Sequence, residues 1–229
     1  MVPTVELEAL VFDFDGLVVD TERPELEAWQ AVYRDYGVGL TLDEWAHCIG
    51  TVDAFDPHER LEELLGRGLD PEAVSAARRT HYARLSADLA VLPGVLDWLT
   101  MAKARGLRVA VASSSPPSWV ERHLTQFGLI DRFEHRSCYD GTCPPKPAPD
   151  LYTNAVTALG VEPTAALALE DSPNGARAAK AAGLWCVAVP HDLTRDLDLS
   201  MADAVIDSLA AIDLDGVVEL LSRSRSAPQ

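Results

Sequence analysis

Four short segments of the chain carry side chains that together could transfer a phosphoryl group. Asp13 and Asp15 are two residues apart, so in extended chain both carboxyl groups point the same way. Residues 113–115 are consecutive serines, and Lys146 and the pair Glu170–Asp171 follow later. Four carboxylates placed together would repel one another unless a divalent cation lay among them. Mg²⁺ prefers oxygen ligands and bridges to phosphate, so it fits such a cluster.

This set of groups has a defined chemistry. A carboxylate beside Mg²⁺ can act as a nucleophile, and a second acid can protonate the leaving oxygen and later deprotonate water. Ser113, with Ser114 and nearby backbone N–H groups, can bind phosphoryl oxygens while Lys146 supplies positive charge. Each segment alone also has an ordinary structural explanation, as a helix cap, a turn or a surface lysine. The functional interpretation depends on all four meeting in space.

The elements around these segments predict that they do meet. Apolar runs typical of buried parallel strands occupy residues 9–13, 108–112, 166–169, 185–189 and, more weakly, 204–206. Helical patterns fill residues 95–105, 117–127, 150–159 and 174–182, and each is followed by glycine. This alternation predicts an α/β fold with a doubly wound, Rossmann-like parallel sheet. Ligands of such sheets bind beyond the carboxyl ends of the strands, where the reactive segments fall.

Residues 21–92 interrupt the alternation. They contain helical patterns at residues 25–36, 42–48, 57–65 and 71–89 but no convincing strand, and they are too long for one crossover connection. We therefore expect an inserted all-helical cap domain at residues 18–91. The catalytic core would comprise residues 1–17 and 92–222, and the polar residues 223–229 would form a frayed tail.

The composition restricts the possible partners. The 229 residues include 19 Lys and Arg against 36 Asp and Glu, a net charge of −17, which argues against nucleic acid or an anionic membrane as partner. No uncharged run approaches the ~18–20 residues of a membrane span, and no secretory signal is visible. The four cysteines lack metal-binding spacing. We expect a cytoplasmic protein with free thiols, either a monomer or a weak dimer.

The four segments, in their order, resemble the motifs of the haloacid dehalogenase-like hydrolase superfamily. The resemblance rests on residues 12–22, Ser113, residues 146–150 and residues 169–175, and it extends over nearly the whole chain. The subgroup that it resembles has a helical cap inserted after the first motif. That subgroup includes phosphoglycolate phosphatases, sugar-phosphate phosphatases and β-phosphoglucomutase.

The resemblance implies a role for each motif residue. Asp13 would be the nucleophile and Asp15 the general acid and base. Ser113 and Lys146 would bind the phosphoryl group. The expected activity is that of a phosphatase that hydrolyses a small phosphorylated metabolite through an aspartyl-phosphate intermediate.

The resemblance also implies a magnesium site. Asp171 would bind Mg²⁺ together with Asp13 and the backbone carbonyl of Asp15. Glu170 would assist directly or through a water molecule.

Substrate contacts are expected outside the metal site. Thr21 and Ser114 are candidates near the core motifs, and Gly50 and Asp53 are candidates in a cap loop at residues 47–56. Acids in that loop would suit sugars or polyols better than carboxylated substrates. A solvated connection between helices is an equally acceptable explanation of the loop.

Two other functions stay open at this stage. A β-phosphoglucomutase-like enzyme uses a cap arginine and a histidine after the first motif to hold a bisphosphate, and the corresponding positions here hold Asp53 and Glu25. Acids there would repel a second phosphate, which favours a phosphatase. A phosphoacceptor or phosphate-sensing module also combines acids, a hydroxyl and a lysine, but it needs neither the helical insertion nor Asp15.

Overall fold

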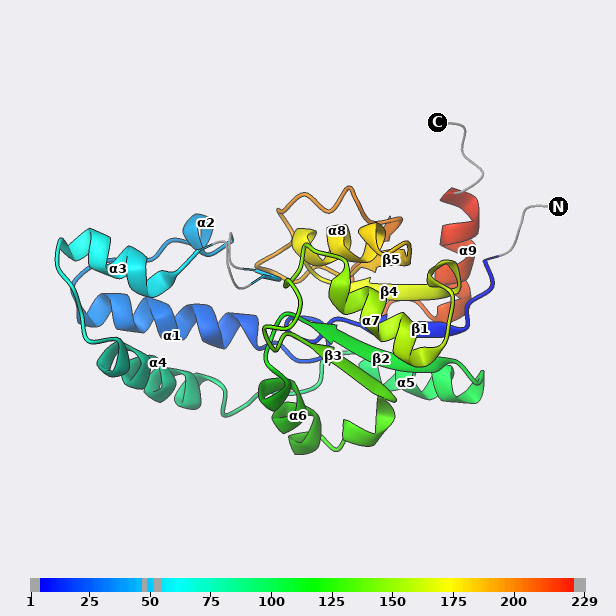
Figure 1. Cartoon of the computed structure of the whole chain (residues 1–229), viewed down its shortest axis with the longest axis horizontal. Coiled ribbons are helices and arrows are strands. Elements are labelled where there is room, and N and C mark those ends of the chain that lie inside the picture. The colour runs from blue at the N-terminus through cyan, green and yellow to red at the C-terminus, as the bar shows by residue number, and fades with distance from the viewer. Residues whose placement is uncertain (1–4, 47–48, 52–54, 225–229) are drawn as a thin grey trace.

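The computed structural model describes residues 5–46, 49–51 and 55–224, and its centre is a parallel sheet (Figure 1). Six strands lie in the order β3-β2-β1-β4-β5-β6. They are β1 (Ala9–Phe12), β2 (Arg108–Ser113), β3 (His135–Cys138), β4 (Ala166–Glu170), β5 (Trp185–Ala188) and β6 (Ala204–Val205). The strand order changes direction between β1 and β4, which is where open α/β sheets bind their ligands.

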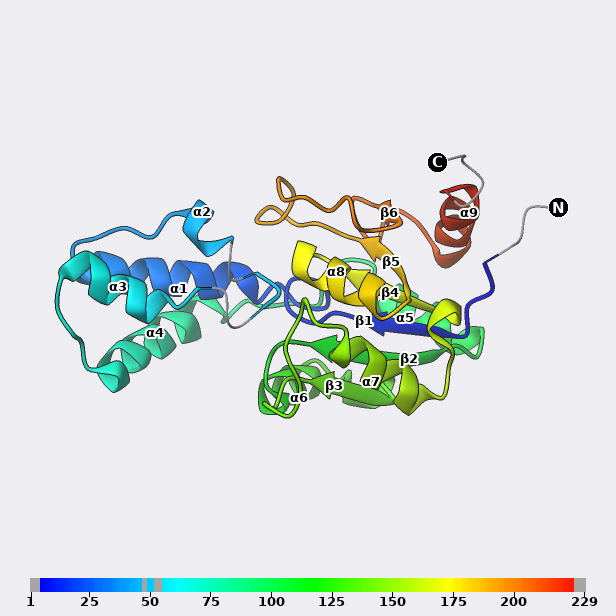
Figure 2. The same cartoon turned by 45° about the horizontal axis from the view of Figure 1, so that its top comes forward.

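Helices cover both faces of the sheet (Figure 2). One face packs against α5 (Val95–Ala104), α6 (Pro117–Gln126) and α9 (Leu214–Ser224). The other packs against α7 (Asp150–Leu159) and α8 (Pro173–Ala181). Short 3₁₀ helices at Ile130–Arg132 and Pro163–Ala165 precede β3 and β4. The doubly wound α/β fold expected from the sequence is therefore confirmed.

Alternate residues of each strand face opposite layers, as the pleat of a strand requires. In β1, Leu10 and Phe12 contribute to the cluster with α5, α6 and α9, while Ala9 and Val11 contribute to the cluster with α7 and α8. The strand side chains on the second face are mostly alanine in β2 and β4 as well. These small side chains allow α7 and α8 to lie close to the strands.

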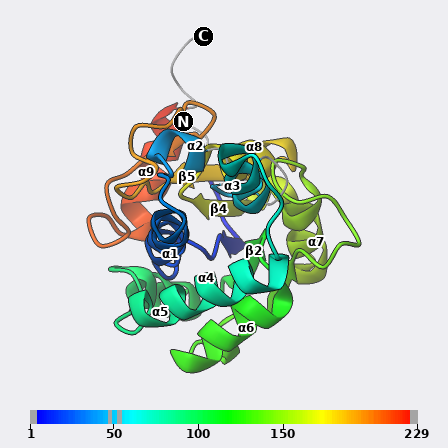
Figure 3. The same cartoon turned by 90° about the vertical axis from the view of Figure 1, so that its left-hand side faces the viewer.

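Among the described residues, four helices lie between β1 and α5 and stand apart from the sheet, beyond the carboxyl ends of its strands (Figure 1). Figure 3 looks at the molecule from the side of these helices. They are α1 (Glu22–Asp35), α2 (Leu42–Trp45), α3 (Pro57–Leu65) and α4 (Pro71–Leu85), together called the helical insert. The helical insert has its own cluster of buried side chains, which includes Val32, Tyr33 and Leu61. Leu193 and Leu197, from the segment between β5 and β6, pack against that cluster.

The two segments that join the helical insert to the sheet lie side by side. Val19 and Val91 form an antiparallel bridge, and the N–H of Leu92 donates to the carbonyl of Val18 over 2.9 Å. Both segments therefore cross to the insert at one place. The boundaries expected for a cap domain, residues 18–91, stay a prediction.

Two elements depart from the sequence-based expectations. β3 was not expected, because its residues, His135–Cys138, contain no apolar run; it is an edge strand that pairs only with β2. The helix α9 was not expected either. It continues to Ser224, so residues 223 and 224 are not frayed as expected, and residues 225–229 lie outside the described part of the chain.

The end of α9 has local support for its helical conformation. Arg223 forms an ion pair with Glu219 one turn earlier at 2.5 Å, and Leu221 is buried against the sheet.

Elsewhere in the described ranges, Cys138, Cys143 and Cys186 are free thiols. None of the helices in those ranges combines the length and the apolar character that a membrane crossing requires.

Candidate active site

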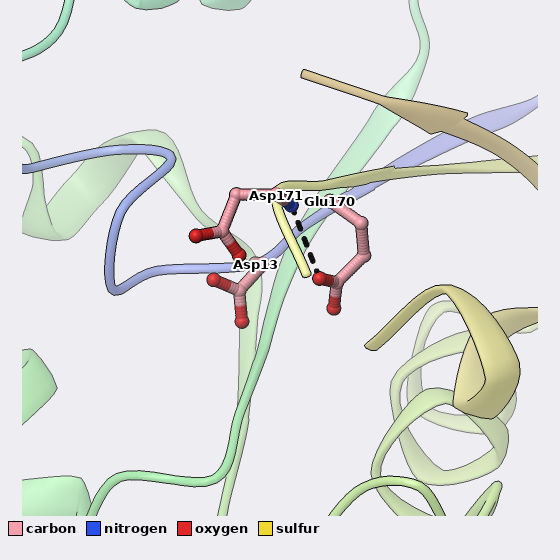
Figure 4. A group of neighbouring side chains, drawn as sticks. All are labelled: Asp13, Glu170 and Asp171. Atoms are coloured by element: carbon pink, nitrogen blue, oxygen red, sulfur yellow. Dashed lines mark hydrogen bonds between the residues drawn. The ribbon is translucent and has the colours of Figure 1, made fainter. Parts of the chain in front are cut away.

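Three carboxyl groups from two neighbouring strands meet at the carboxyl end of the sheet (Figure 4). Asp13 follows β1 directly, Glu170 ends β4, and Asp171 is the next residue. Pairing of β1 with β4 places the ends of these strands side by side. One carboxylate oxygen from each residue lies within 4.8 Å of the other two, and all three side chains are buried. The structure thus brings together three of the four acids that the sequence singled out.

Lys146 lies between two of these carboxylates. Its Nζ donates to Oδ1 of Asp13 and, over 2.6 Å, to Oε1 of Glu170, and only 1% of its side chain is exposed. The hydroxyl of Tyr152 also donates to Oε1 of Glu170, over 2.6 Å. A Cβ at Gly175 of α8 would overlap the Glu170 carboxylate, so glycine is required for this close approach. Glu170 is thereby fixed and holds Lys146 beside Asp13.

The crowding of charges changes the pKa values in this cluster. Burial raises the pKa of Asp13 well above its ordinary value; Lys146 opposes this, and Glu170 and Asp171 add to it. Burial also raises the pKa of Asp171, against the effect of a hydrogen bond from His191. Burial alone would lower the pKa of Lys146, but its acidic neighbours raise it. The cluster is therefore short of positive charge.

The carboxyl group of Asp15 has a separate set of partners. Its Oδ1 accepts hydrogen bonds from Thr21 Oγ1 at 2.6 Å and from Trp119 Nε1 at 2.8 Å. Its Oδ2 accepts from Ser115 Oγ at 2.6 Å and from Ser113 Oγ at 3.3 Å. Thr21 and Ser113 thus both contact Asp15, while Ser115 and Trp119 were missed by the sequence analysis. Nothing in the sequence distinguishes Trp119 from a tryptophan of an ordinary core.

His191, in the segment after β5, was also missed. Its Nε2 lies 2.9 Å from Oδ2 of Asp171, and the backbone N–H of Leu193 donates to its Nδ1 over 3.3 Å. Because Nδ1 accepts this hydrogen bond, Nε2 carries the proton and donates to Asp171. His191 therefore fixes the orientation of the Asp171 carboxylate. Its position after a strand end is the only sequence signal that could have identified it.

Residues 49–51 of the helical insert contact the core beside the site. Ser114 Oγ donates to the carbonyl of Gly50 over 3.1 Å and accepts from the N–H of Lys146 at 3.3 Å. Asn174 Nδ2 donates to the carbonyl of Ile49 over 3.0 Å. Gly50 has a φ of +75° and lies so close to Ser172 that a Cβ would overlap its Oγ. Ser114 and Gly50 thus join the insert to the core, and a direct contact of either with substrate stays a prediction.

A cavity of about 310 Å³ opens beside Asp15, between the core and the helical insert. It is lined by Asp15, Thr21, Glu22, Glu25, Trp45, Thr51, Arg78, Ser115, Pro116 and Trp119. The predicted substrate contact Asp53 lies outside the described residues.

The cluster of Asp13, Glu170 and Asp171 fits a hard divalent cation. Its donors are all carboxylate oxygens within reach of one ion, and the ammonium of Lys146 is paired with two of the three buried acids. Buried carboxylates without compensating charge strongly destabilise a folded chain, which a bound cation would relieve. The carboxyl group of Asp15 is not part of this cluster, and its backbone carbonyl stays the predicted fourth ligand.

Comparison with known families identifies the chain. A family model described as haloacid dehalogenase-like hydrolase matches residues 7–183. The chain belongs to the haloacid dehalogenase-like hydrolase family. The resemblance stated from the motifs is therefore confirmed. The matched range includes β1 to β4 and the residues Asp13, Lys146, Glu170 and Asp171.

Individual relatives of this hydrolase match over nearly their full length. YhcW of Bacillus subtilis (strain 168) is 42% identical over 208 residues, which cover 91% of this chain and 94% of YhcW. Hexitol phosphatase B of Escherichia coli (strain K12) is 29% identical over 224 residues, covering 90% and 95% of the two chains. These similarities make the hydrolase a phosphatase, a hydrolase of phosphoric monoesters.

A solved structure with a bound sugar bisphosphate has the same fold. A mutant of CbbY from Rhodobacter sphaeroides in complex with xylulose-(1,5)bisphosphate is 30% identical to this hydrolase, with a TM-score of 0.72. The alignment covers 92% of this chain and 98% of that one.

Proposed function

We propose that this phosphatase hydrolyses a small phosphorylated metabolite, with Mg²⁺ and through an aspartyl-phosphate on Asp13. Candidate substrates are sugar phosphates, polyol phosphates and phosphoglycolate. The observation that carries the proposal is the presence of two acids with different partners. Asp13, the proposed nucleophile, is buried beside Lys146, whereas Asp15 accepts hydrogen bonds from Ser115 and Trp119. The activity named for Hexitol phosphatase B and the bisphosphate bound to CbbY support a small sugar-like substrate.

The residues that would hold Mg²⁺ are Asp13, Glu170, Asp171 and the carbonyl of Asp15. When bound there, Mg²⁺ would neutralise the carboxylates and draw negative charge from the phosphoryl group. Lys146 would contribute a second positive charge to the same group, and Ser113 a hydroxyl donor. These groups would bind the phosphoryl oxygens and leave phosphorus exposed to an oxygen of Asp13.

In the first step an oxygen of Asp13 forms a bond to phosphorus, and the bond from phosphorus to the leaving oxygen breaks. Asp15 gives its proton to that oxygen, so the leaving group departs as a neutral alcohol. Trp119 Nε1 can only donate, so Oδ1 of Asp15 must remain an acceptor. Ser113 and Ser115 can accept as well as donate, so in the acid form of Asp15 the proton would lie on Oδ2, with one of these two hydroxyls turned to accept it.

In the second step a water molecule is the nucleophile that attacks phosphorus. Asp15, now a carboxylate, takes a proton from water while the water oxygen bonds to phosphorus. The bond between phosphorus and the Asp13 oxygen breaks, and inorganic phosphate leaves. Both residues return to their starting protonation states, so the cycle balances.

We further propose that the helical insert acts as a cap domain with boundaries at residues 18–91. Its contact with the core at Gly50 and its share of the cavity beside Asp15 support this role. A cap would exclude water during the first step and supply substrate contacts. Location in the cytoplasm and a monomeric or weakly dimeric state stay predictions from the sequence.

Hydrolysis of p-nitrophenyl phosphate tests the proposal. We expect activity that requires added Mg²⁺ and is removed by a chelator. Asp13→Asn should lower kcat by about 10⁴-fold or more, since the nucleophile is lost. Rapid quenching of the wild-type enzyme should trap phosphate on the protein as an acyl phosphate cleaved by hydroxylamine. Activity retained by Asp13→Asn would refute the nucleophile, and a phosphoenzyme stable for many minutes would favour a phosphate-sensing module.

A further inference from the structure

The cavity beside Asp15 is where the leaving group of the proposed reaction must lie. A general acid has to contact the oxygen that it protonates, and Asp15 lines this cavity. The part of the substrate that follows this oxygen therefore enters the space between α1, α4 and α6. The charges of that space decide which leaving groups are accepted.

Three acids and one base among the described residues line the cavity: Asp15, Glu22, Glu25 and Arg78. Arg78 could bind an anionic substrate, but it already forms an ion pair with Glu25. Its Nη1 lies 2.5 Å from Oε1 of Glu25, and the two side chains are only 24% and 23% exposed. The pair joins α4 to α1 across the cavity wall. An anion arriving here would have to compete with Glu25 for Arg78.

The surroundings of Glu22 disfavour a further negative charge in the cavity. Glu22 follows Thr21 at the start of α1, and burial and then the charges of Asp15 and Asp171 raise its pKa well above the ordinary value. A second phosphate or a carboxylate would meet the same acids and be repelled. A hydroxyl group has no such conflict, because a carboxyl oxygen can accept its hydrogen bond.

The remaining wall suits the carbon skeleton and hydroxyl groups of a sugar. The indole rings of Trp45 and Trp119 offer flat apolar surfaces, and Thr51 and Ser115 offer hydroxyls. The volume of about 310 Å³ is at the small end of ligand pockets.

We infer that this cavity is a leaving-group site that selects an uncharged, polyhydroxylated leaving group and rejects one with a second anionic group. The preferred substrates are then sugar or polyol monophosphates rather than sugar bisphosphates or phosphoglycolate. Glu25 determines this specificity by holding Arg78. The inference rests on the proposed function and narrows its substrate class.

The test is kcat/KM, in Mg²⁺, for a hexitol monophosphate, a hexose monophosphate, the bisphosphate of the same hexose, and phosphoglycolate. We expect the wild-type enzyme to prefer the monophosphates by about tenfold or more. Glu25→Gln releases Arg78 and should shift the ratio toward the bisphosphate by about tenfold. Arg78→Gln leaves Glu25 unpaired and should move the ratio the opposite way. Glu27→Gln, on the same helix but lining a different cavity, should leave the ratio unchanged.

Each outcome separates the inference from the proposed function. If wild-type enzyme hydrolyses p-nitrophenyl phosphate but prefers the bisphosphate or phosphoglycolate, the inference is wrong and the proposed function stands. The same holds if Glu25→Gln and Arg78→Gln, both folded by circular dichroism, change the ratio by less than about twofold. If p-nitrophenyl phosphate is not hydrolysed at all, the proposed function itself fails.

Discussion

Trp119 donates its indole N–H to Oδ1 of Asp15 over 2.8 Å, although the two residues come from α6 and from the loop after β1. The ring of Trp119 itself contacts side chains from two helices, α4 and α6. Tyr82 of α4 packs against it with ring centroids 5.3 Å apart, and the guanidinium of Arg122 lies 4.9 Å from its centre. The proposed general acid is thus oriented by an aromatic side chain that also touches the helical insert.

We predict that Trp119→Phe impairs protonation of the leaving group. The variant keeps an aromatic ring but removes the hydrogen bond to Asp15, whose net contribution is about 0.5–1.5 kcal/mol. The value of kcat on a sugar phosphate should fall roughly three- to tenfold. Activity on p-nitrophenyl phosphate should fall less, because its leaving group needs no proton. Trp185→Phe, which removes an indole hydrogen bond to Thr164 away from the site, serves as control. An equal loss on both substrates would contradict the role.

We predict that Mg²⁺ and the charge of Asp13 have opposite effects on stability. Burial and neighbouring acids disfavour ionised Asp13 in the folded protein, so without Mg²⁺ Asp13→Asn should raise Tm. The rise is about 2–4 °C for each kcal/mol gained. Mg²⁺ at a hundred times its Kd should stabilise the wild-type enzyme by about 2.7 kcal/mol, and Asp13→Asn much less. Thermal unfolding of the wild type and of Asp13→Asn, each with and without Mg²⁺, measures both effects. If Mg²⁺ does not change the Tm of the wild type, the metal site is wrong.

We predict that His191 sets the affinity for Mg²⁺ through Asp171. His191→Ala removes the hydrogen bond that orients the Asp171 carboxylate and should weaken Mg²⁺ binding by about 10- to 100-fold, measured by titration calorimetry. His191→Gln, whose side-chain amide can donate in place of Nε2, should restore most of the affinity. Similar Mg²⁺ affinities in the wild type and in His191→Ala would show that His191 has no such role.

We predict that Gly50→Ala opens the contact between the helical insert and the core. A Cβ at this position overlaps Ser172 Oγ, so residues 49–51 must move away and KM should rise severalfold. Gly37→Ala is the matched control: its φ is +79°, close to that of Gly50, but nothing lies within 4 Å of an added Cβ. It carries the same backbone penalty without the overlap. A KM that rises equally in both variants would exclude the contact as the cause.

The sheet was predictable because its central strands are buried on both faces. The runs that form β1, β2, β4 and β5 are almost continuously apolar, and glycine follows each of the four predicted core helices. The edge strand β3 has mostly half-buried side chains and carries His135 and Arg136, so no apolar run marks it. A continuous apolar run indicates a strand whose side chains are fully buried on both faces, and β3 is not such a strand.

The centre of the site was predictable because strand ends converge in an open sheet. Asp13 and Glu170 could be placed in this way because they lie at the ends of two predicted strands, and Lys146 because its loop precedes a predicted core helix. Trp119 and His191 could not, because their roles come from side chains that reach back from a helix or a loop. Glu25 and Arg78 meet only through the packing of α1 on α4, which no spacing in the sequence reveals.

The paired segments at Val18 and Leu92 have a consequence for how this fold can evolve. The polypeptide leaves the sheet and returns to it at one point. A different domain could therefore replace the helical insert if its own two ends lay next to each other. Such a module can lengthen, shrink or be exchanged while the phosphate chemistry beneath it is preserved. A new selectivity can then be acquired without rebuilding the catalyst.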